Sequence, residues 1–169
     1  MNIEKELLNK KHNREKFDCG VDSLNHYFKF QASQDVKRKL SVCFVFSTNN
    51  IVKGFYTLSS GSIPLEDVPK KYSKRYPKSY SKIPIVLLGR LAVDYNFKGK
   101  GLGEFMLIDA LQECYEVSKA KIGAASVIVD PVNEDAENFY KKYGFIKLAD
   151  SGKMFLPMKT IKKLFDDAG

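Results

Sequence analysis

The chain carries Lys98-Gly99-Lys100-Gly101-Leu102-Gly103 between an apolar segment that predicts a strand and an amphipathic segment that predicts a helix. Glycine lacks a Cβ, so alternating glycines permit unusual dihedrals and let another group approach the main chain. A helix that begins here directs unpaired N–H groups and the positive end of its dipole at the loop. With the charges of Lys98 and Lys100, this favours a pyrophosphate cradle. A plain glycine-rich turn is the alternative.

The spacing G-x-G-x-G differs from the P-loop pattern and from the dinucleotide-binding pattern G-x-G-x-x-G. A second group of residues, from Asn133 to Phe145, follows the strand segment that ends at Val129. Two parallel strands that splay apart would bring the helix of residues 133–143 beside the glycine loop. The loop and this helix would then share one ligand.

Residue patterning predicts the remaining elements and their order. Asn49-Asn50 suits the turn of a β-hairpin, Asp22 or Ser23 is expected to cap the first helix, and Gly144 to end the helix before it. A mixed α/β domain with one central sheet follows from this order. The predicted elements are a helix at 18–38, hairpin strands at 41–47 and 51–58, an irregular segment at 64–84, a strand at 84–94, a helix at 102–118, a strand at 124–129, a helix at 133–143, strands at 145–148 and 154–158, and a short basic helix after Thr160.

Length and composition indicate one globular domain over residues 1–169, with 44% hydrophobic and 28% charged residues. No apolar run approaches the roughly 18 residues of a membrane span, and the N-terminus lacks the apolar core of a signal peptide. Cys19, Cys43 and Cys114 are odd in number and far apart, and there are only two histidines. We therefore expect no disulfide framework, no metal site and a cytoplasmic setting.

The excess of 28 Lys and Arg over 20 Asp and Glu gives a net charge of +8 and predicts an anionic partner or ligand. Composition alone leaves nucleic acid, an anionic membrane and a phosphorylated cofactor open. The stretch from Lys70 to Lys82 has six cations and no acid, interleaved with tyrosines that can stack on bases. A solvated basic loop is the alternative. The residues expected to bind RNA phosphates are Lys37, Arg38, Lys70, Lys71, Lys74, Arg75 and Lys78.

Arg90 interrupts an otherwise apolar strand segment. A charge in such a position normally has a dedicated partner. We expect this partner to be a phosphate, another group of the substrate or an internal acid.

At three places the sequence resembles the GNAT superfamily of acetyl-CoA-dependent N-acetyltransferases. These are Leu91-Ala92-Val93-Asp94, the loop Lys98–Gly103, and Asn133-x-x-Ala136-x-x-Phe139-Tyr140-x-x-x-Gly144-Phe145. The resemblance implies a central mixed sheet with a strand splay, flanked by helices, that binds acetyl-CoA and releases CoA. It implies that Tyr140 protonates the leaving thiolate, with Tyr143 as the alternative donor. The implied cofactor-binding residues are Leu91, Ala92, Val93, Lys98, Gly99, Lys100, Gly101, Leu102, Gly103, Glu104 and Asn133.

Two positions depart from the family pattern. Lys98 stands where Gln or Arg is usual, which keeps the charge and loses the planar fork. Ile128 stands where many relatives have a glutamate general base. An α-amine has a reference pKa near 8, against about 10.4 for a lysine amine. An esterified amino acid is more acidic still, so the missing glutamate favours an aminoacyl acceptor.

Further segments resemble the GNAT-type toxins of bacterial toxin–antitoxin pairs over about residues 17–160. Those enzymes acetylate the α-amine of aminoacyl-tRNA and block translation, they commonly dimerise, and their antitoxins are ribbon-helix-helix proteins. The resemblance implies the same substrate and partners here. A GNAT enzyme acting on a protein N-terminus, a polyamine or another small amine, and a non-catalytic CoA- or RNA-binding regulator, are the alternatives. The matching segments are Phe17–Gly20, Leu24–Tyr27, Ala32–Asp35, Tyr56–Ser59, Ile83-Pro84, Leu87–Asp94 and Phe155–Met158.

Overall fold

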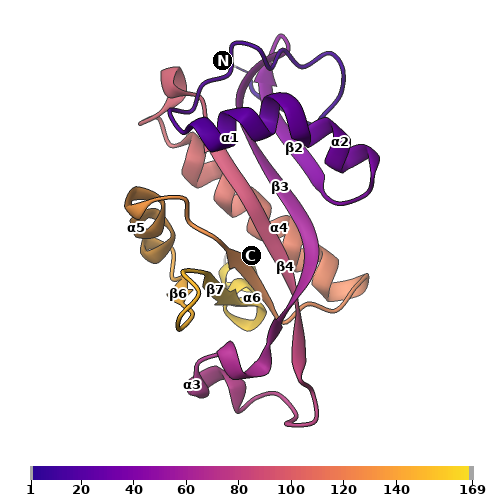
Figure 1. The fold of residues 1–169 in the computed structure, drawn as a ribbon, viewed down its shortest axis with the longest axis vertical. Coiled ribbons are helices and arrows are strands. Elements are labelled where there is room, and N and C mark those ends of the chain that lie inside the picture. The colour runs from indigo at the N-terminus through magenta and orange to yellow at the C-terminus, as the bar shows by residue number, and fades with distance from the viewer. Residues whose placement is uncertain (1, 168–169) are drawn as a thin grey trace. The chain divides into compact units, whose positions relative to one another are not determined.

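The structure, a computed structural model, describes residues 2–167 (Figure 1). Its strands have the hydrogen-bonded order β1-β2-β3-β4-β5-β7-β6 and include parallel and antiparallel pairs, so the predicted mixed α/β fold is confirmed. The strands are β1 (Glu4–Leu7), β2 (Val42–Thr48), β3 (Ile51–Pro64), β4 (Lys82–Val93), β5 (Ser126–Val129), β6 (Ile146–Lys147) and β7 (Met154–Pro157). The helices are α1 (Asp22–His26), η1 (Tyr27–Gln31), α2 (Ala32–Lys37), η2 (Leu65–Asp67), α3 (Lys70–Ser73), η3 (Tyr95–Phe97), α4 (Leu102–Ala120), α5 (Glu134–Lys142) and α6 (Met158–Asp166).

The chain forms two compact units. The first unit holds the residues up to Ser59 together with Gly89–Ala110, and the second holds Ser60–Leu88 together with the residues from Leu111 onward. Strands β3 and β4 and helix α4 each contribute residues to both units.

An aromatic core fills the first unit, where the helical segment α1–η1–α2 packs on strands β2 and β3 (Figure 1). Phe28 is fully buried and stacks on Phe55 with ring centroids 4.1 Å apart. The helical segment begins at Asp22, later than predicted, and its five-residue centre η1 is π-helical. The predicted capping by Asp22 or Ser23 is wrong, because the N-cap is Val21 and no side chain caps it.

The hairpin of β2 and β3 is confirmed, with Asn49 at φ 50° and Asn50 at φ 64° between the antiparallel strands. Two left-handed residues match the right-handed twist of the flanking strands. Strand β1 was not predicted. It pairs with β2 at the edge of the sheet and is mostly exposed, so it lacks an apolar pattern. Lys5 instead ties it to Asp109 of α4 through a 2.7 Å ion pair.

Strand β5 is the centre of the second unit, and all four of its residues are buried. It pairs parallel with β4, from Ile85–Ser126 to Leu88–Val129, and antiparallel with β7. Strand β4 continues to Val93 after its last pair with β5. This is the end of pairing that the predicted splay requires.

Gly144 ends α5 with φ 92°, as predicted. A Cβ there would lie 3.6 Å from Leu156, an ordinary contact, so only the backbone opposes a side chain. We expect Gly144→Ala to lower the free energy of unfolding by about 1–2 kcal/mol in a urea titration. Gly123→Ala is the matched control, because its Cβ meets nothing within 4 Å and its φ is unstrained. Equal stability of the two variants would contradict the strain argument.

Candidate functional site

The glycine loop of the first unit has the backbone that a pyrophosphate cradle needs. Gly99 and Gly101 have φ of +74° and +81°, and a Cβ at either would meet nothing within 4 Å. The hydrogen bond from Phe105 N–H to Gly101 O, 3.0 Å long, opens helix α4. The N–H groups of Leu102 to Glu104 precede it and have no helical acceptor. An open glycine cradle, free N–H groups and a positive dipole fit the diphosphate of CoA.

The two lysines of this loop differ in their contacts. The Lys98 ammonium donates a hydrogen bond to the Cys19 carbonyl and so joins the loop to the segment before α1. The pKa of Asp18 is lowered mainly by hydrogen bonds from Gly20 and Asn25. The charges of Lys29 and Lys98 lower it further. The Lys100 ammonium lies 5.6 Å from the ring centroid of Phe97 and is exposed. Lys100 is therefore the better placed of the two to meet an anion.

The end of β4 is held in place by Asp94, which is 5% exposed. Its carboxylate accepts the N–H groups of Asn96 (2.9 Å) and Asp18 (3.1 Å), and its own N–H donates to Lys53 O (2.8 Å). The chain thereby leaves Leu91–Val93 in a fixed direction toward the glycine loop. Ala92 and Val93 are buried and Leu91 is partly so, and their contact with pantetheine stays a prediction.

In the second unit, Asn133 is the N-cap of α5, and its side chain accepts the Ala136 N–H at 2.8 Å. Asn133 is exposed, so this bond leaves its amide N–H₂ open to a ligand. Asn133 therefore caps the helix, and its contact with pantetheine stays a prediction.

Tyr140 lies on α5 with a buried ring, edge-on to Phe139 and Phe145 at centroid distances of 5.4 and 5.3 Å. Burial raises its pKa well above the ordinary value, so the phenol is protonated at neutral pH. Within residues 2–167, no group hydrogen-bonds its hydroxyl, and Ser41 Oγ is the only fully buried side-chain polar atom without a partner. The Tyr140 hydroxyl therefore reaches the surface of its unit, free to donate to a ligand.

Ile128 occupies the position of the usual glutamate and is 1% exposed. On β5 it pairs with Leu87 and Phe155 inside the apolar cluster of the second unit. No carboxylate is available at this position, as the sequence indicates.

The basic stretch of the second unit presents its charges to solvent. Its exposed cations are Lys70, Lys71, Lys74, Arg75 and Lys78. The tyrosines between them divide into two kinds. Tyr72 and Tyr76 pack against the apolar cluster, with Tyr72 edge-on to Phe155 at 5.2 Å, whereas Tyr80 is 58% exposed. Only Tyr80 presents an open ring to a base.

Lys37 and Arg38, in the first unit, are exposed at the end of α2. Arg90, on β4, is partly buried, and its guanidinium carbon lies 3.6 Å from the ring centroid of Tyr27. The Tyr27 hydroxyl donates to Asp35 at 2.9 Å. Sequence reasoning assigned no role to Tyr27 or Asp35, although both belong to matching segments. The sequence indicates the hydrogen bond between Tyr27 and Asp35 only through their spacing, eight positions apart on one helical segment.

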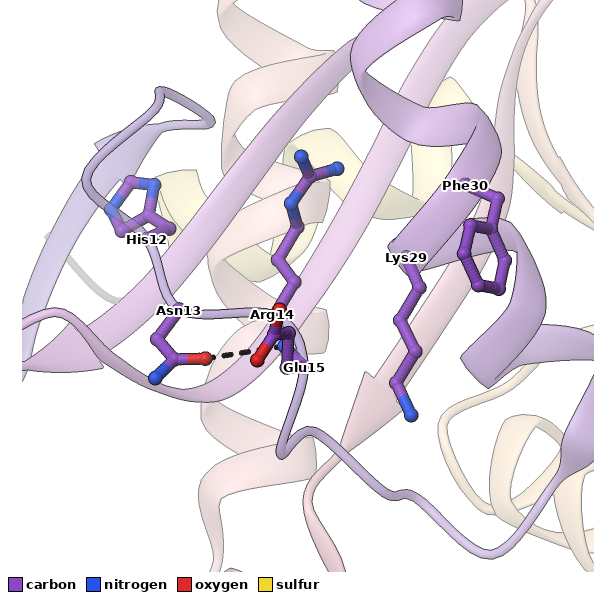
Figure 2. A pocket seen from close by; sticks show the side chains of 6 residues that line it. All are labelled: His12, Asn13, Arg14, Glu15, Lys29 and Phe30. Carbon is purple, nitrogen blue, oxygen red and sulfur yellow. Dashed lines mark hydrogen bonds between the residues drawn. The ribbon is translucent and has the colours of Figure 1, made fainter.

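An open pocket of about 690 Å³ lies in the first unit, between the segment before α1 and the π-helical turn. Figure 2 shows the side chains that line it. It contains none of the predicted site residues. Its lining combines cations, an acid and a largely exposed ring, and consists of His12, Asn13, Arg14, Glu15, Lys29 and Phe30.

No helix among residues 2–167 is long and apolar enough to cross a membrane. That part of the chain also holds no cluster of three His, Cys, Asp or Glu suited to a metal ion.

Residues 39–147 match the acetyltransferase (GNAT) domain family. A curated relative, the tRNA-acetylating toxin of Mycobacterium tuberculosis (strain ATCC 25618 / H37Rv), is 34% identical over 152 residues, which are 89% of each chain. The solved structure of AtaT complexed with acetyl-methionyl-tRNAfMet is 30% identical with a TM-score of 0.88, covering 97% of this chain and 99% of that one. A Tyr-to-Phe mutant of the toxin AtaT, bound to the C-terminus of the antitoxin AtaR and acetyl-CoA, is 27% identical with a TM-score of 0.82, covering 98% and 99%.

The chain belongs to the GNAT family of acetyltransferases. The predicted fold, N-acetyltransferase class and acetyl-CoA cofactor are thereby confirmed. Within this family it is similar over nearly its whole length to toxins of toxin–antitoxin pairs, as the sequence predicts.

Proposed function

We propose that the protein is a toxin that transfers the acetyl group of acetyl-CoA to the α-amine of aminoacyl-tRNA, releases CoA and so inhibits translation. The observation that carries this proposal is its similarity, over nearly the whole chain, to a tRNA-acetylating toxin. The glycine cradle and the free Tyr140 hydroxyl supply the chemistry, and the exposed basic stretch suits an RNA substrate.

The proposed cofactor contacts follow the geometry of each segment. The free N–H groups from Gly99 to Glu104 bind the diphosphate, assisted by Lys98 and Lys100, and the backbone of Leu91–Val93 pairs with pantetheine. The amide of Asn133 meets the same arm. Bound acetyl-CoA supplies the activated thioester.

Tyr140 is the proposed general acid. Its Oη proton passes to the departing sulfur as the amine nitrogen bonds to the acetyl carbon and the carbon–sulfur bond breaks. The proton that the nitrogen then loses returns through water to the Tyr140 phenolate. A phenol whose pKa is raised by burial holds this proton until sulfur develops charge. Ile128 offers no base, so the acceptor amine must be substantially neutral by itself. An aminoacyl ester meets this condition at neutral pH better than a lysine side chain.

Reversing the charges of Lys70, Lys74 and Arg75 to Glu is expected to raise the KM for aminoacyl-tRNA at least about tenfold in 150 mM salt, because three phosphate contacts are lost. The expected slope of log KM against log salt becomes shallower. Reversal of Lys159, Lys162 and Lys163, exposed on α6, is the matched control. An unchanged KM and salt slope in the first variant would mean that another surface binds the RNA.

The partners proposed are a ribbon-helix-helix antitoxin and a second copy of this chain, both supported by the resemblance to the toxin branch. A surplus of +8 also suits an acidic antitoxin tail. We assign the protein to the cytoplasm, where charged tRNA and acetyl-CoA meet. We also propose that residues 1–169 act as one catalytic domain, because β3, β4 and α4 each run through both units.

Incubation with labelled acetyl-CoA and either total RNA or total protein tests the proposed substrate. Label is expected in RNA, and mild alkali, which hydrolyses the aminoacyl ester, should release it. Label in protein or in free small amines would instead support an acetyltransferase with another acceptor. Absence of transfer to any acceptor would support a non-catalytic CoA- or RNA-binding regulator.

A further inference from the structure

Arg90 has an unusual environment for an arginine on a central strand. One face of its guanidinium is covered by the ring of Tyr27, 3.6 Å away, and Tyr27 itself is 3% exposed in the aromatic core of the first unit. Such a stack compensates the charge in part and orients the guanidinium plane.

Arg90 has no acidic partner in the part of the chain that the structure describes. Across residues 2–167 it forms no ion pair, and the acid nearest along this network, Asp35, accepts a hydrogen bond from the Tyr27 hydroxyl instead. The guanidinium nitrogens also lack hydrogen-bond partners, yet none of them is a fully buried unpaired atom. The N–H groups of Arg90 therefore reach the surface, while its face is fixed by a ring.

Both ends of this arrangement are anchored. The Arg90 backbone N–H donates to Thr57 Oγ1 at 3.1 Å, and a Cβ at the neighbouring Gly89 would lie 3.1 Å from the same oxygen. At the other end, Asp35 holds the Tyr27 hydroxyl at 2.9 Å. The guanidinium is thus presented in one orientation, which lowers the entropy cost of binding a ligand.

A planar fork of N–H donors matches the two oxygens of a phosphate. Lys29, on the same π-helical turn as Tyr27, and Lys37 and Arg38 beyond it add positive charge to this helical segment. Arg90 is three residues from the end of β4, and the glycine cradle for the CoA diphosphate follows after η3. Because the cradle already supplies donors for the CoA diphosphate, the cations of the helical segment favour a phosphate of RNA as the ligand of Arg90.

Resting on the proposed function, we infer that Arg90 binds a phosphate of the RNA substrate. Tyr27 and Asp35 are positioning residues that hold its guanidinium in place. Charged hydrogen bonds of this kind contribute at least about tenfold in affinity.

The first test measures kcat and KM for Arg90→Lys, which keeps the charge and loses the fork. The KM for aminoacyl-tRNA should rise about tenfold, with kcat and the KM for acetyl-CoA unchanged. Arg14→Lys is the matched control, because Arg14 is also a partly buried arginine of the first unit and bonds only the Phe28 carbonyl. An unchanged KM for aminoacyl-tRNA would overturn the inference. A raised KM for acetyl-CoA alone would mean that Arg90 binds the cofactor. In either case, the proposed function stands as long as the wild-type enzyme acetylates aminoacyl-tRNA.

The second test separates positioning from stability through a double-mutant cycle. Tyr27→Leu should raise the KM for aminoacyl-tRNA as much as Arg90→Lys does, and the double variant should cost no more than either. Tyr27→Phe, which keeps the ring and loses the bond to Asp35, should cost about two- to threefold, and Asp35→Ala the same. Additive effects in the cycle would overturn the positioning role. If Tyr27→Leu does not fold, Tyr27→Phe and Asp35→Ala decide, and a wild-type KM in both would overturn it.

Discussion

Replacing Tyr140 by Phe is expected to lower kcat for acetyl transfer by about 10²- to 10⁴-fold, the usual contribution of a general acid. The variant loses one oxygen whose hydroxyl makes no hydrogen bond within residues 2–167, so the fold loses no internal hydrogen bond. The ring keeps its edge contacts with Phe139 and Phe145. Acetyl-CoA should therefore bind with wild-type affinity, measured by calorimetry, while single-turnover transfer to aminoacyl-tRNA is lost.

Tyr143→Phe is the matched control for this experiment, since Tyr143 lies on the same segment and is the alternative donor. We expect it to keep most of the activity. If Tyr143→Phe is inactive and Tyr140→Phe is not, the proton comes from Tyr143.

The pH dependence of kcat adds a second criterion. Because burial raises the pKa of Tyr140, the phenol keeps its proton well above neutral pH. We therefore expect that kcat does not fall between pH 7 and about pH 9 through deprotonation of Tyr140.

Replacing Gly101 by Val is expected to weaken acetyl-CoA binding at least about 100-fold. Gly101 has φ +81°, which costs an L-residue about 1–2 kcal/mol. A branched side chain would also fill the open space beside the N–H groups that start α4. Calorimetry with acetyl-CoA measures the effect directly.

Gly152→Val is the matched control for the loop variant. Gly152 has φ +72° and the same open space around a Cβ, but it lies in the turn before β7. Gly152→Val therefore introduces the same backbone strain as Gly101→Val but lies outside the glycine loop. We expect a similar loss of stability in both variants and a loss of cofactor affinity in Gly101→Val alone. Equal cofactor affinity in the two variants would remove the glycine loop from the cofactor site.

Much of the fold follows from local signals in the sequence. The left-handed pair Asn49-Asn50 and the terminating Gly144 act through local backbone preferences. The helical spacing of apolar residues indicates α4, whose buried face they form. Strand β1 has no such signal, because its stability comes from pairing with β2 and from the ion pair of Lys5 with Asp109. The π-helical turn has no such signal either, and two of its residues, Tyr27 and Phe28, are buried in the aromatic core.

The candidate site shows the same division. The glycine spacing and the cations at 70–78 could be predicted, because each depends on residue type and position. The ring that covers Arg90 could not, because Tyr27 is brought to the guanidinium by tertiary packing, and the sequence indicates only that this charge needs a partner. Likewise, Tyr72 and Tyr76 alternate with cations in sequence but face the core. Only tertiary packing decides which ring of such a stretch is open.

The position of the transferred acetyl group tests the central claim most directly. The protein is incubated with acetyl-CoA and charged tRNA, the RNA is digested with a nuclease that releases the 3′-terminal nucleoside, and the product is analysed by mass spectrometry. We predict an N-acetylated aminoacyl-adenosine, formed by the wild type and not by Tyr140→Phe. Unmodified aminoacyl-adenosine in the presence of active enzyme, with acetyl groups on protein or free amines instead, would contradict the account.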